Sequence, residues 1–166
     1  FMLDNGDGIP ADKKEAARYY KMAADKGKSA AMNSYANMLY KGDGIPVDKK
    51  EAARYFKMAI DKGDSDAMNS YAFMLYKGDG IPVNKKEAAR YYKMAIDKGN
   101  SDAMHIFAFM LENGDGIPAD KKEAARYYKM AANKGNIIAM NNYAVMLYEG
   151  DGIPVDKKEA ARYFKM

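Results

Sequence analysis

One stretch decides the fold: Gly42-Asp43-Gly44-Ile45-Pro46-Val47-Asp48-Lys49-Lys50-Glu51-Ala52-Ala53-Arg54-Tyr55. It occurs five times with small changes, and the copies open 36 residues apart, at Gly6, Gly42, Gly78, Gly114 and Gly150. A fixed period of this length is typical of a solenoid whose repeats cannot bury their apolar faces alone. The sequence therefore predicts a single all-α array of helix–turn–helix repeats over residues 1–166, about 4.6 repeats long, with boundaries near residues 28, 64, 100 and 136.

The stretch ends one helix and begins the next. Gly42 follows an apolar-periodic run and fits the left-handed position that ends a helix, because Gly takes positive φ without a Cβ penalty. Ile45 precedes Pro46 and is therefore extended, so we expect it to fill the gap between the two helices as a core residue. Asp48 is predicted to cap the next helix, and Glu51 to complete a capping box with the Asp48 amide.

The same phases predict the helices and the core of every repeat. We expect helices over residues 13–26, 30–41, 49–62, 66–77, 85–98, 102–113, 121–134 and 138–149, and a last one from residue 157. Apolar spacing predicts that these helices bury Ala52, Tyr55, Phe56, Ala59, Ala67, Met68, Tyr71, Ala72 and Leu75. The tyrosines at the phase of Tyr55 are expected to be buried between helices as well: Tyr19, Tyr91 and Tyr127.

The composition of the chain excludes some kinds of cofactor site and disfavours some kinds of partner. The chain has no Cys, which excludes disulfides and thiolate metal sites and is compatible with a reducing compartment. Its net charge of +4 comes mostly from Lys interleaved with acidic residues, which favours a solvated surface over a nucleic-acid interface. No apolar run approaches the length of a membrane span. The chain opens inside a repeat at Phe1, so we expect the natural start to lie upstream, and the localisation stays unknown.

No motif predicts catalysis or a cofactor. His105 is the only His and has no Cys partner, and Ser101 on the same helix suits a helix start better than a nucleophile. Residues 27–29, Gly-Lys-Ser, lack the first Gly of a phosphate-binding loop and follow a helix rather than a strand. A calcium loop in residues 4–8 would place Leu3 where an oxygen ligand is needed. We therefore predict a protein that is not an enzyme and needs no metal or cofactor.

One repeat carries the pattern Ala67-x3-Tyr71-Ala72-x2-Leu75-x2-Gly78-x-Gly80-Ile81-x2-Asn84-x3-Ala88-x2-Tyr91-Tyr92-x2-Ala95-x3-Gly99. This pattern, which recurs in every repeat, resembles the SEL-one-like repeat (SLR), a relative of the tetratricopeptide repeat. The family usually has Leu, Gly, Tyr and Lys at the positions of Tyr71, Ala72, Leu75 and Glu87. The resemblance implies a right-handed α/α superhelix whose first helices line a concave face, and a role as an adaptor or scaffold for protein partners. Some family members are linked to penicillin binding and are rich in disulfides, which a chain without Cys cannot form.

The positions that differ between repeats gather on one face of the first helices. Aligned by the period, they are positions 30/66/102/138, 34/70/106/142, 37/73/109/145 and 41/77/113/149, with 33/69/105/141 beside them. This face lies opposite the predicted buried stripe, so one interpretation is plain solvent exposure. The other is a ligand groove, favoured by apolar Phe73, Ile106 and Phe109 and by Asn side chains that can pair with the main chain of an extended peptide.

We predict that this face binds a protein or peptide segment on its concave side. The candidate partner-binding residues, which we call the first-helix stripe, are Asn33, Asn37, Asp66, Asn69, Ser70, Phe73, Lys77, Asp102, His105, Ile106, Phe109, Asn141, Asn142 and Val145. One alternative is a structural spacer or assembly module that stacks end to end without a ligand, through apolar ends at residues 1–3 and 163–166. A second is a hydrolase of the SLR type. The near-identity of the repeats is also compatible with a consensus design or a recent repeat expansion.

Overall fold

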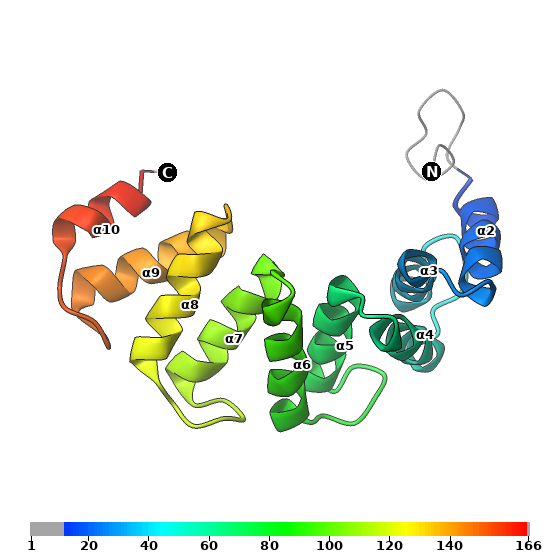
Figure 1. Ribbon diagram of the computed structural model, residues 1–166, viewed down its shortest axis with the longest axis horizontal. Helices are drawn as coiled ribbons and strands as arrows, with labels where there is room; N and C mark the ends of the chain where they lie inside the picture. Colours follow the sequence, from blue (N-terminus) through cyan, green and yellow to red (C-terminus); the bar gives the residue numbers. More distant parts are fainter. Residues whose placement is uncertain (1–11, 166) are drawn as a thin grey trace. The chain divides into compact units, whose positions relative to one another are not determined.

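The computed structural model describes residues 12–165, and all of the regular secondary structure in that range is α-helical. The helices are α2 (Lys13–Asp25), α3 (Ser29–Lys41), α4 (Lys49–Asp61), α5 (Ser65–Lys77), α6 (Lys85–Asp97), α7 (Ser101–Asn113), α8 (Lys121–Asn133), α9 (Ile137–Glu149) and α10 (Lys157–Tyr163) (Figure 1). Each predicted helix is confirmed to within one residue at the ends that were predicted. The odd-numbered helices are the first helices of their repeats, and the even-numbered ones are the second helices.

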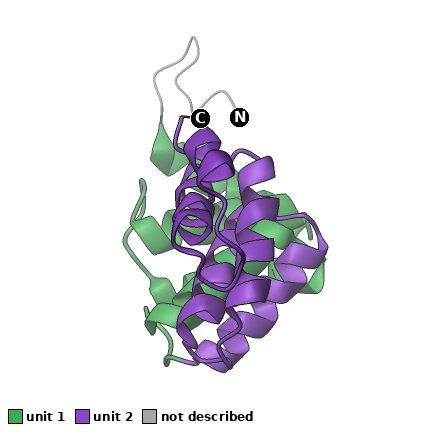
Figure 2. Ribbon diagram, turned by 90° about the vertical axis from the view of Figure 1, so that its left-hand side faces the viewer, with its two compact units in different colours: residues 1–83 green, residues 84–166 purple. Residues whose placement is uncertain are grey.

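The chain divides into two compact units, residues 1–83 and 84–166 (Figure 2). In unit 1, α3 packs against α2 and α4, and α4 also packs against α5. In unit 2, α7 packs against α6 and α8, while α9 packs against α8 and α10. In each unit, helices that follow one another in the sequence therefore pack against one another. The single array over residues 1–166 stays a prediction.

Short polar side chains begin the second helices, as predicted for Asp48. The capping side chains accept a hydrogen bond from the amide three residues on, at 2.8 to 3.0 Å, and belong to Asp12, Asp48, Asn84, Asp120 and Asp156. The other half of the predicted capping box, a bond between the Glu51 side chain and the Asp48 amide, is wrong. The Asp48 amide donates to the Leu39 carbonyl at 2.9 Å, so Glu51 is not needed there and pairs with Arg54 instead, at 2.5 Å.

Gly42 ends α3 in the left-handed conformation, as predicted, with φ of 73°. Its amide donates to the Met38 carbonyl at 2.9 Å, and the Asp43 amide donates to the same oxygen at 3.0 Å. The chain thereby satisfies the carbonyl that the end of the helix leaves open. Ile45 follows, half-buried, and packs against two clusters of buried side chains in unit 1. Its expected place between the helices is confirmed.

A recurring lock joins the loop of one repeat to the second helix of the repeat before it. The Nζ atoms of Lys13, Lys49, Lys85 and Lys121 lie 2.6 to 2.8 Å from the carboxylates of Asp43, Asp79, Asp115 and Asp151 respectively. The Gly after each Asp lies against the same lysine. A Cβ atom at Gly80 would come 2.3 Å from Lys49 Cβ, and one at Gly116 would come 2.4 Å from Lys85 Cβ. Within each unit, the Asp-Gly pair thus specifies how consecutive repeats stack.

The core combines small side chains with large ones. The predicted stripe of α4 is confirmed, because Ala52, Tyr55, Phe56 and Ala59 are at most 2% exposed. The Tyr55 ring packs edge-on against Tyr35 of α3, with 4.9 Å between ring centroids, a geometry that adds about 1 kcal/mol to its burial. Alanines allow the close approach of the helices that this contact needs.

The first helices bury a wider face than the sequence predicted. In α5, Ala67, Met68, Ala72 and Leu75 are buried as expected, and Tyr71 is half-buried. The structure adds a methionine that the predicted stripe omits, at 6% exposure or less in each of the first helices that the structure describes: Met38, Met74, Met110 and Met146. These methionines lie one residue before the predicted Leu position, and they show that two adjacent rows of each first helix face the core.

The expected burial of the tyrosines is correct for two of them and wrong for the others. Tyr55 and Tyr127 are 2% and 4% exposed, whereas Tyr19 is 48% exposed and Tyr91 is only half-buried. Tyr127 packs on Phe107 of α7 as Tyr55 packs on Tyr35. Both buried tyrosines therefore pack edge-on against a ring of the first helix before them.

Candidate functional site

The described structure buries no residue of the first-helix stripe. In unit 1 its members lie on α3 and α5: Asn33, Asn37, Asp66, Asn69, Ser70, Phe73 and Lys77. In unit 2 they lie on α7 and α9: Asp102, His105, Ile106, Phe109, Asn141, Asn142 and Val145. All are exposed or half-buried. The stripe therefore lies at the surface of each unit, and its role in binding stays a prediction.

The unit 1 part of the stripe joins amide groups to one aromatic ring and one cation. Asn37 Nδ2 donates to the Asn33 carbonyl at 3.0 Å and to Asn33 Oδ1 at 3.2 Å. On α5, Phe73 is 37% exposed, and the Lys77 ammonium group lies 6.0 Å from the centre of its ring. Asn69 Oδ1 is buried and accepts no hydrogen bond from the described residues. This part of the face offers a flat ring, amide groups and a positive charge.

A hollow of about 310 Å³ lies between α2 and α3 in unit 1. Its lining residues are Tyr20, Ser34, Asn37, Met38, Lys41 and Asp43. Three of them, Ser34, Asn37 and Lys41, occupy positions that differ between repeats. The variable face of α3 is therefore hollowed where it meets the second helix of the preceding repeat.

The unit 2 part of the stripe is more apolar and carries different charges. Phe109 and Val145 are 42% and 38% exposed, and Ile106 is half-buried. Asp102 Oδ1 accepts a hydrogen bond from Asn136 Nδ2 at 3.2 Å, which ties the start of α7 to the residue that caps α9. Neither α7 nor α9 contains a Lys or an Arg. This part of the face therefore presents apolar side chains and carboxylates without a cation.

Tyr128 of α8 forms a polar base for this part of the stripe. Its hydroxyl donates to Glu112 Oε2 on α7 at 2.8 Å, and its ring lies 6.4 Å from the His105 ring, centroid to centroid. Burial, and then the bond to Glu112, raise the pKa of Tyr128, while the Asn142 side chain on α9 acts in the opposite direction. The structure thus brings together two predicted residues, His105 and Asn142, with Glu112 and Tyr128, which the sequence analysis did not predict.

The missed residues left one signal in the sequence. Glu112 stands where the other described repeats have Tyr40, Tyr76 and Tyr148, so comparison of the repeats could have found it. Tyr128 gave no such signal, because its phase carries only Tyr or Phe in the other repeats. Burial lowers the pKa of His105, and Asp102 partly opposes this effect. Burial therefore favours the neutral form of His105.

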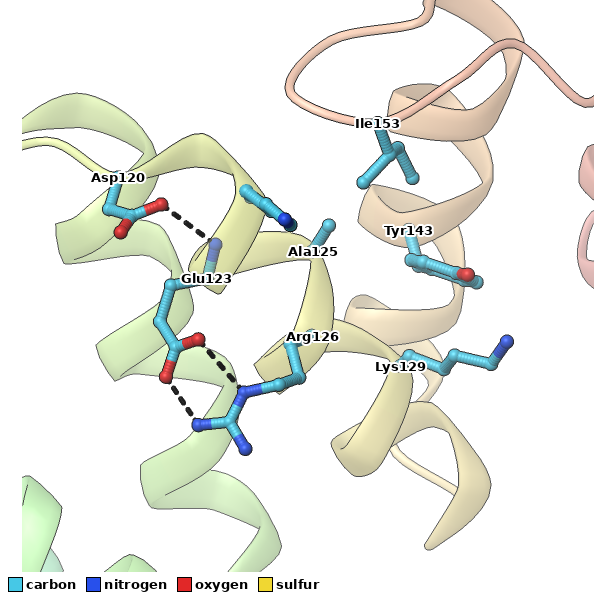
Figure 3. A pocket seen from close by; sticks show the side chains of 8 residues that line it. Asp120, Glu123, Ala125, Arg126, Lys129, Tyr143 and Ile153 are labelled. Carbon is cyan, nitrogen blue, oxygen red and sulfur yellow. Dashed lines mark hydrogen bonds and ion pairs between the residues drawn. The ribbon is translucent and has the colours of Figure 1, made fainter.

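A second hollow, of about 470 Å³, was not predicted (Figure 3). It lies between α8, α9 and the loop before α10, and Tyr143 and Ile153 face the α8 side chains across it. Arg126 is held by both oxygens of Glu123, and Lys129 lies 3.4 Å from Glu159 and 5.5 Å from the centre of the Tyr143 ring. Two of the three cations that line the hollow, Arg126 and Lys129, therefore already have partners, and the third is Lys122.

The described residues present no arrangement of chemical groups that indicates a reaction. Residues 12–165 contain no group of three or more His, Cys, Asp or Glu side chains that could hold a metal ion. No helix in that range is long and apolar enough to cross a membrane. The calcium-like segment 4–8 lies outside the described residues, as do residues 1–3 and 166 of the predicted stacking ends. Phe164 at the other end is 52% exposed, and stacking through the ends stays a prediction.

Comparisons with known proteins agree with the repeat pattern. The family model of the Sel1 repeat matches residues 1–28, 29–64, 65–100, 101–136 and 137–166. A Sel1 repeat protein from Oxalobacter formigenes is 30% identical, with a TM-score of 0.94 over 99% of this chain and 67% of that one. A protective antigen of uropathogenic Escherichia coli strains, which displays an SLR fold, is 28% identical, with a TM-score of 0.92 over 99% of this chain. This chain spans 35% of the length of that antigen.

Cysteine-rich protein B of Helicobacter pylori shares the fold alone, at 20% identity and a TM-score of 0.60 over 78% of this chain and 92% of that one. No curated protein matches the sequence. The likenesses confirm the predicted fold class, an all-α solenoid of 36-residue repeats, and the resemblance to SLR proteins. Repeats of this kind are generally non-catalytic scaffolds for protein interactions.

Proposed function

Because the chain belongs to the Sel1 repeat family, we propose that it is a non-catalytic adaptor that binds an extended segment of a partner protein along the first-helix stripe. One observation carries the proposal. Three positions of the first-helix stripe that differ between repeats expose a large apolar side chain, Phe73 in unit 1 and Phe109 and Val145 in unit 2. A solvated face without a ligand would favour polar residues there.

The surroundings of the two rings support this function. Each Phe lies on a helix that also offers short polar side chains, Asn69 beside Phe73 and His105 beside Phe109. Aromatic anchors supply most of the binding energy at interfaces, and neighbouring amides fix the register of a bound main chain. The hollow beside Asn37 provides a further place for a side chain of the segment.

The test begins with capture of partners by the intact chain and identification by mass spectrometry. The segment responsible is then synthesised, and its affinity is measured by calorimetry for the wild type and for the double variant Phe73→Ala, Phe109→Ala. We expect the double substitution to weaken binding by more than about 2 kcal/mol, because neither ring belongs to the core and both act as anchors.

The matched control changes the second helices. Lys57 and Arg90 are exposed on α4 and α6, so the variants Lys57→Ala and Arg90→Ala should alter little beyond the salt dependence of binding. Circular dichroism should show the same helix content in all variants. If the affinity survives the double Phe change and is lost on changing Lys57 and Arg90, the stripe is not the binding face.

An assembly module is the second candidate, and one contact favours it. The Lys157 ammonium group lies 4.9 Å from the centre of the Tyr148 ring, as Lys49 lies 5.3 Å from Tyr40 in the lock that receives Asp79. Lys157 and Tyr148 can therefore accept the Asp-Gly loop of another repeat. Sedimentation velocity that shows self-association of the wild type, abolished by Lys157→Glu, would favour this function over the adaptor.

A further inference from the structure

The first helices of the two units carry opposite charges. In unit 1, α3 and α5 carry Lys41 and Lys77 with one carboxylate, Asp66. In unit 2, α7 and α9 carry the carboxylates Asp102, Glu112 and Glu149 and no Lys or Arg. The whole chain has a net charge of +4, so the negative charge of α7 and α9 is opposite in sign to the net charge of the chain. A face of this sign repels nucleic acid and attracts cations.

Glu112 is the carboxylate best placed to recognise a cation. It is half-buried on α7, and its Oε2 atom is fixed by the hydroxyl of Tyr128, which is itself fully buried. No hydrogen bond from the described residues reaches Oε1. A carboxylate that is held on one side and open on the other keeps a fixed direction for a charge-assisted hydrogen bond.

One neighbouring cation must be counted. Lys121 lies near enough to Glu112 and Glu149 for both carboxylates to raise its pKa, after the larger effect of Asp151. Its hydrogen bonds go to the two oxygens of Asp151, each at 2.8 Å. Three carboxylates therefore act on one ammonium group, which leaves a formal excess of negative charge.

The groups around Glu112 define the rest of the recognised segment. Phe109, one helical turn before Glu112, is 42% exposed, and Val145 on α9 is 38% exposed. Burial favours the neutral form of His105, which lies on the same side of α7. A cation paired with Glu112 would thus have apolar surface beside it.

We propose that Glu112, together with the unit 2 part of the stripe, selects a basic segment, one in which a Lys or Arg side chain pairs with Glu112 while an adjacent apolar side chain packs on Phe109. This inference rests on the proposed function and names the chemistry of the partner. In unit 1 the position of Glu112 carries Tyr40 and Tyr76, so the selection belongs to unit 2.

The test uses a random library of short peptides displayed on phage, selected on the immobilised 166-residue chain. The most enriched peptide is synthesised, and its affinity is measured by fluorescence anisotropy. We expect it to carry Lys or Arg next to an apolar residue. Glu112→Gln, which keeps an oxygen for the Tyr128 hydroxyl, should weaken its binding about tenfold, since a charge-assisted pair becomes a neutral one.

Two further variants serve as controls for this result. Glu112→Tyr restores the residue of the other repeats, so it should fold, and it should weaken the peptide as Glu112→Gln does. Glu123→Gln removes a carboxylate from α8 that pairs with Arg126 and lies outside the stripe, and it should leave the affinity within about twofold. Thermal melts of all variants show whether a loss of binding reflects a loss of fold.

The outcomes separate the inference from the function on which it rests. Enriched peptides without a basic residue, or an affinity that Glu112→Gln and Glu112→Tyr leave unchanged, would overturn the selection of a basic segment. The proposed function would survive that result if Phe109→Ala still weakened the same peptide. Absence of any enriched peptide, or an affinity indifferent to both Glu112 and Phe109, would overturn the two together.

Discussion

In unit 1 the exposed face of the first helices carries Lys41 and Lys77, whereas in unit 2 the same phases carry Asn113 and Glu149, and Glu112 replaces a tyrosine. The second helices and loops show no such contrast. The Lys–Asp locks measure 2.7 and 2.6 Å in unit 1 and 2.6 and 2.8 Å in unit 2. The comparison teaches that the loop and the second helix specify the fold, which leaves the face of the first helix free to define a partner.

The largest expected effect tests whether the two cores are equivalent. Tyr55→Ala in unit 1 and Tyr127→Ala in unit 2 should each lower the free energy of unfolding by about 3 to 5 kcal/mol, because each removes a buried ring and leaves a cavity. Urea unfolding followed by circular dichroism measures both. Tyr19→Ala is the control, with an expected loss of about 1 kcal/mol or less, since its side chain is half in solvent. Unequal losses for Tyr55 and Tyr127 would break the equivalence.

The next effect tests the lock. Gly80→Ala and Gly116→Ala each add a Cβ atom within 2.4 Å of a lysine Cβ at a positive φ, so we expect each to lower the free energy of unfolding by about 2 to 4 kcal/mol. Gly135 also has a positive φ but nothing within 4 Å of the added atom. Gly135→Ala should therefore cost only the backbone strain, about 1 kcal/mol. Similar losses for Gly116 and Gly135 would show that the close approach does not matter.

Much of the fold followed from the sequence because a few residue types have narrow conformational roles. Gly42 and its equivalents ended the first helices and the Asp or Asn caps began the second ones, so the helix boundaries were predictable. The hydrogen-bond partner of the Asp48 amide was not predictable, because the Leu39 carbonyl that accepts its bond belongs to the preceding helix. The exposure of Tyr19 was also not predicted, since apolar spacing along one helix does not report how much of a side chain its neighbours cover.

The candidate site was predictable only as a face. The differences between repeats identified the stripe, but they did not reveal what lies beneath it. Tyr128 comes from a second helix and reaches Glu112 of the first, a pairing that depends on how α7 and α8 pack. The Lys–Asp lock was not predicted either. Lys49 and Asp79 have the same residue types at their positions in the other repeats, so a comparison of the repeats could not show that they form a pair.

A smaller effect sharpens the comparison at the lock itself. Asp79 in unit 1 accepts from Lys49 and from the Tyr40 hydroxyl, each at 2.6 Å, and these bonds lower its pKa. Asp151 in unit 2 accepts only from Lys121 among the described residues, because Glu112 stands in place of the tyrosine. Asp79→Asn should therefore destabilise the chain more than Asp151→Asn in urea unfolding.

The tyrosine gives this prediction an independent measurement. Burial and the bond to Asp79 raise the pKa of Tyr40 to about 12. Asp79→Asn should lower that pKa, since the hydroxyl loses its bond to a charged acceptor, and ultraviolet difference spectra follow the titration. A Tyr40 titration that is the same in Asp79→Asn, with equal stability losses for the two variants, would remove this difference between the units.

The smallest effect concerns His105, which only unit 2 contains. Burial holds its pKa below the ordinary value of 6.5, and Asp102 opposes this only in part. At a pH between the folded and the unfolded pKa of His105, the unfolded chain binds more protons than the folded chain. This histidine therefore makes the free energy of unfolding fall as the pH drops through 6.5 toward its folded pKa. The effect is absent above the unfolded value and complete below the folded one.

His105→Asn, which places the residue of unit 1 at this position, should flatten that part of the pH dependence. Carboxylates titrate in both proteins, so the difference between wild type and variant isolates the histidine. Because His105 is the only histidine, its ring proton gives a single NMR signal that reports its pKa directly. A pKa at or above 6.5, with the same pH slope in wild type and variant, would mean that His105 faces open solvent and leaves the unit 2 face no more sheltered than its counterpart.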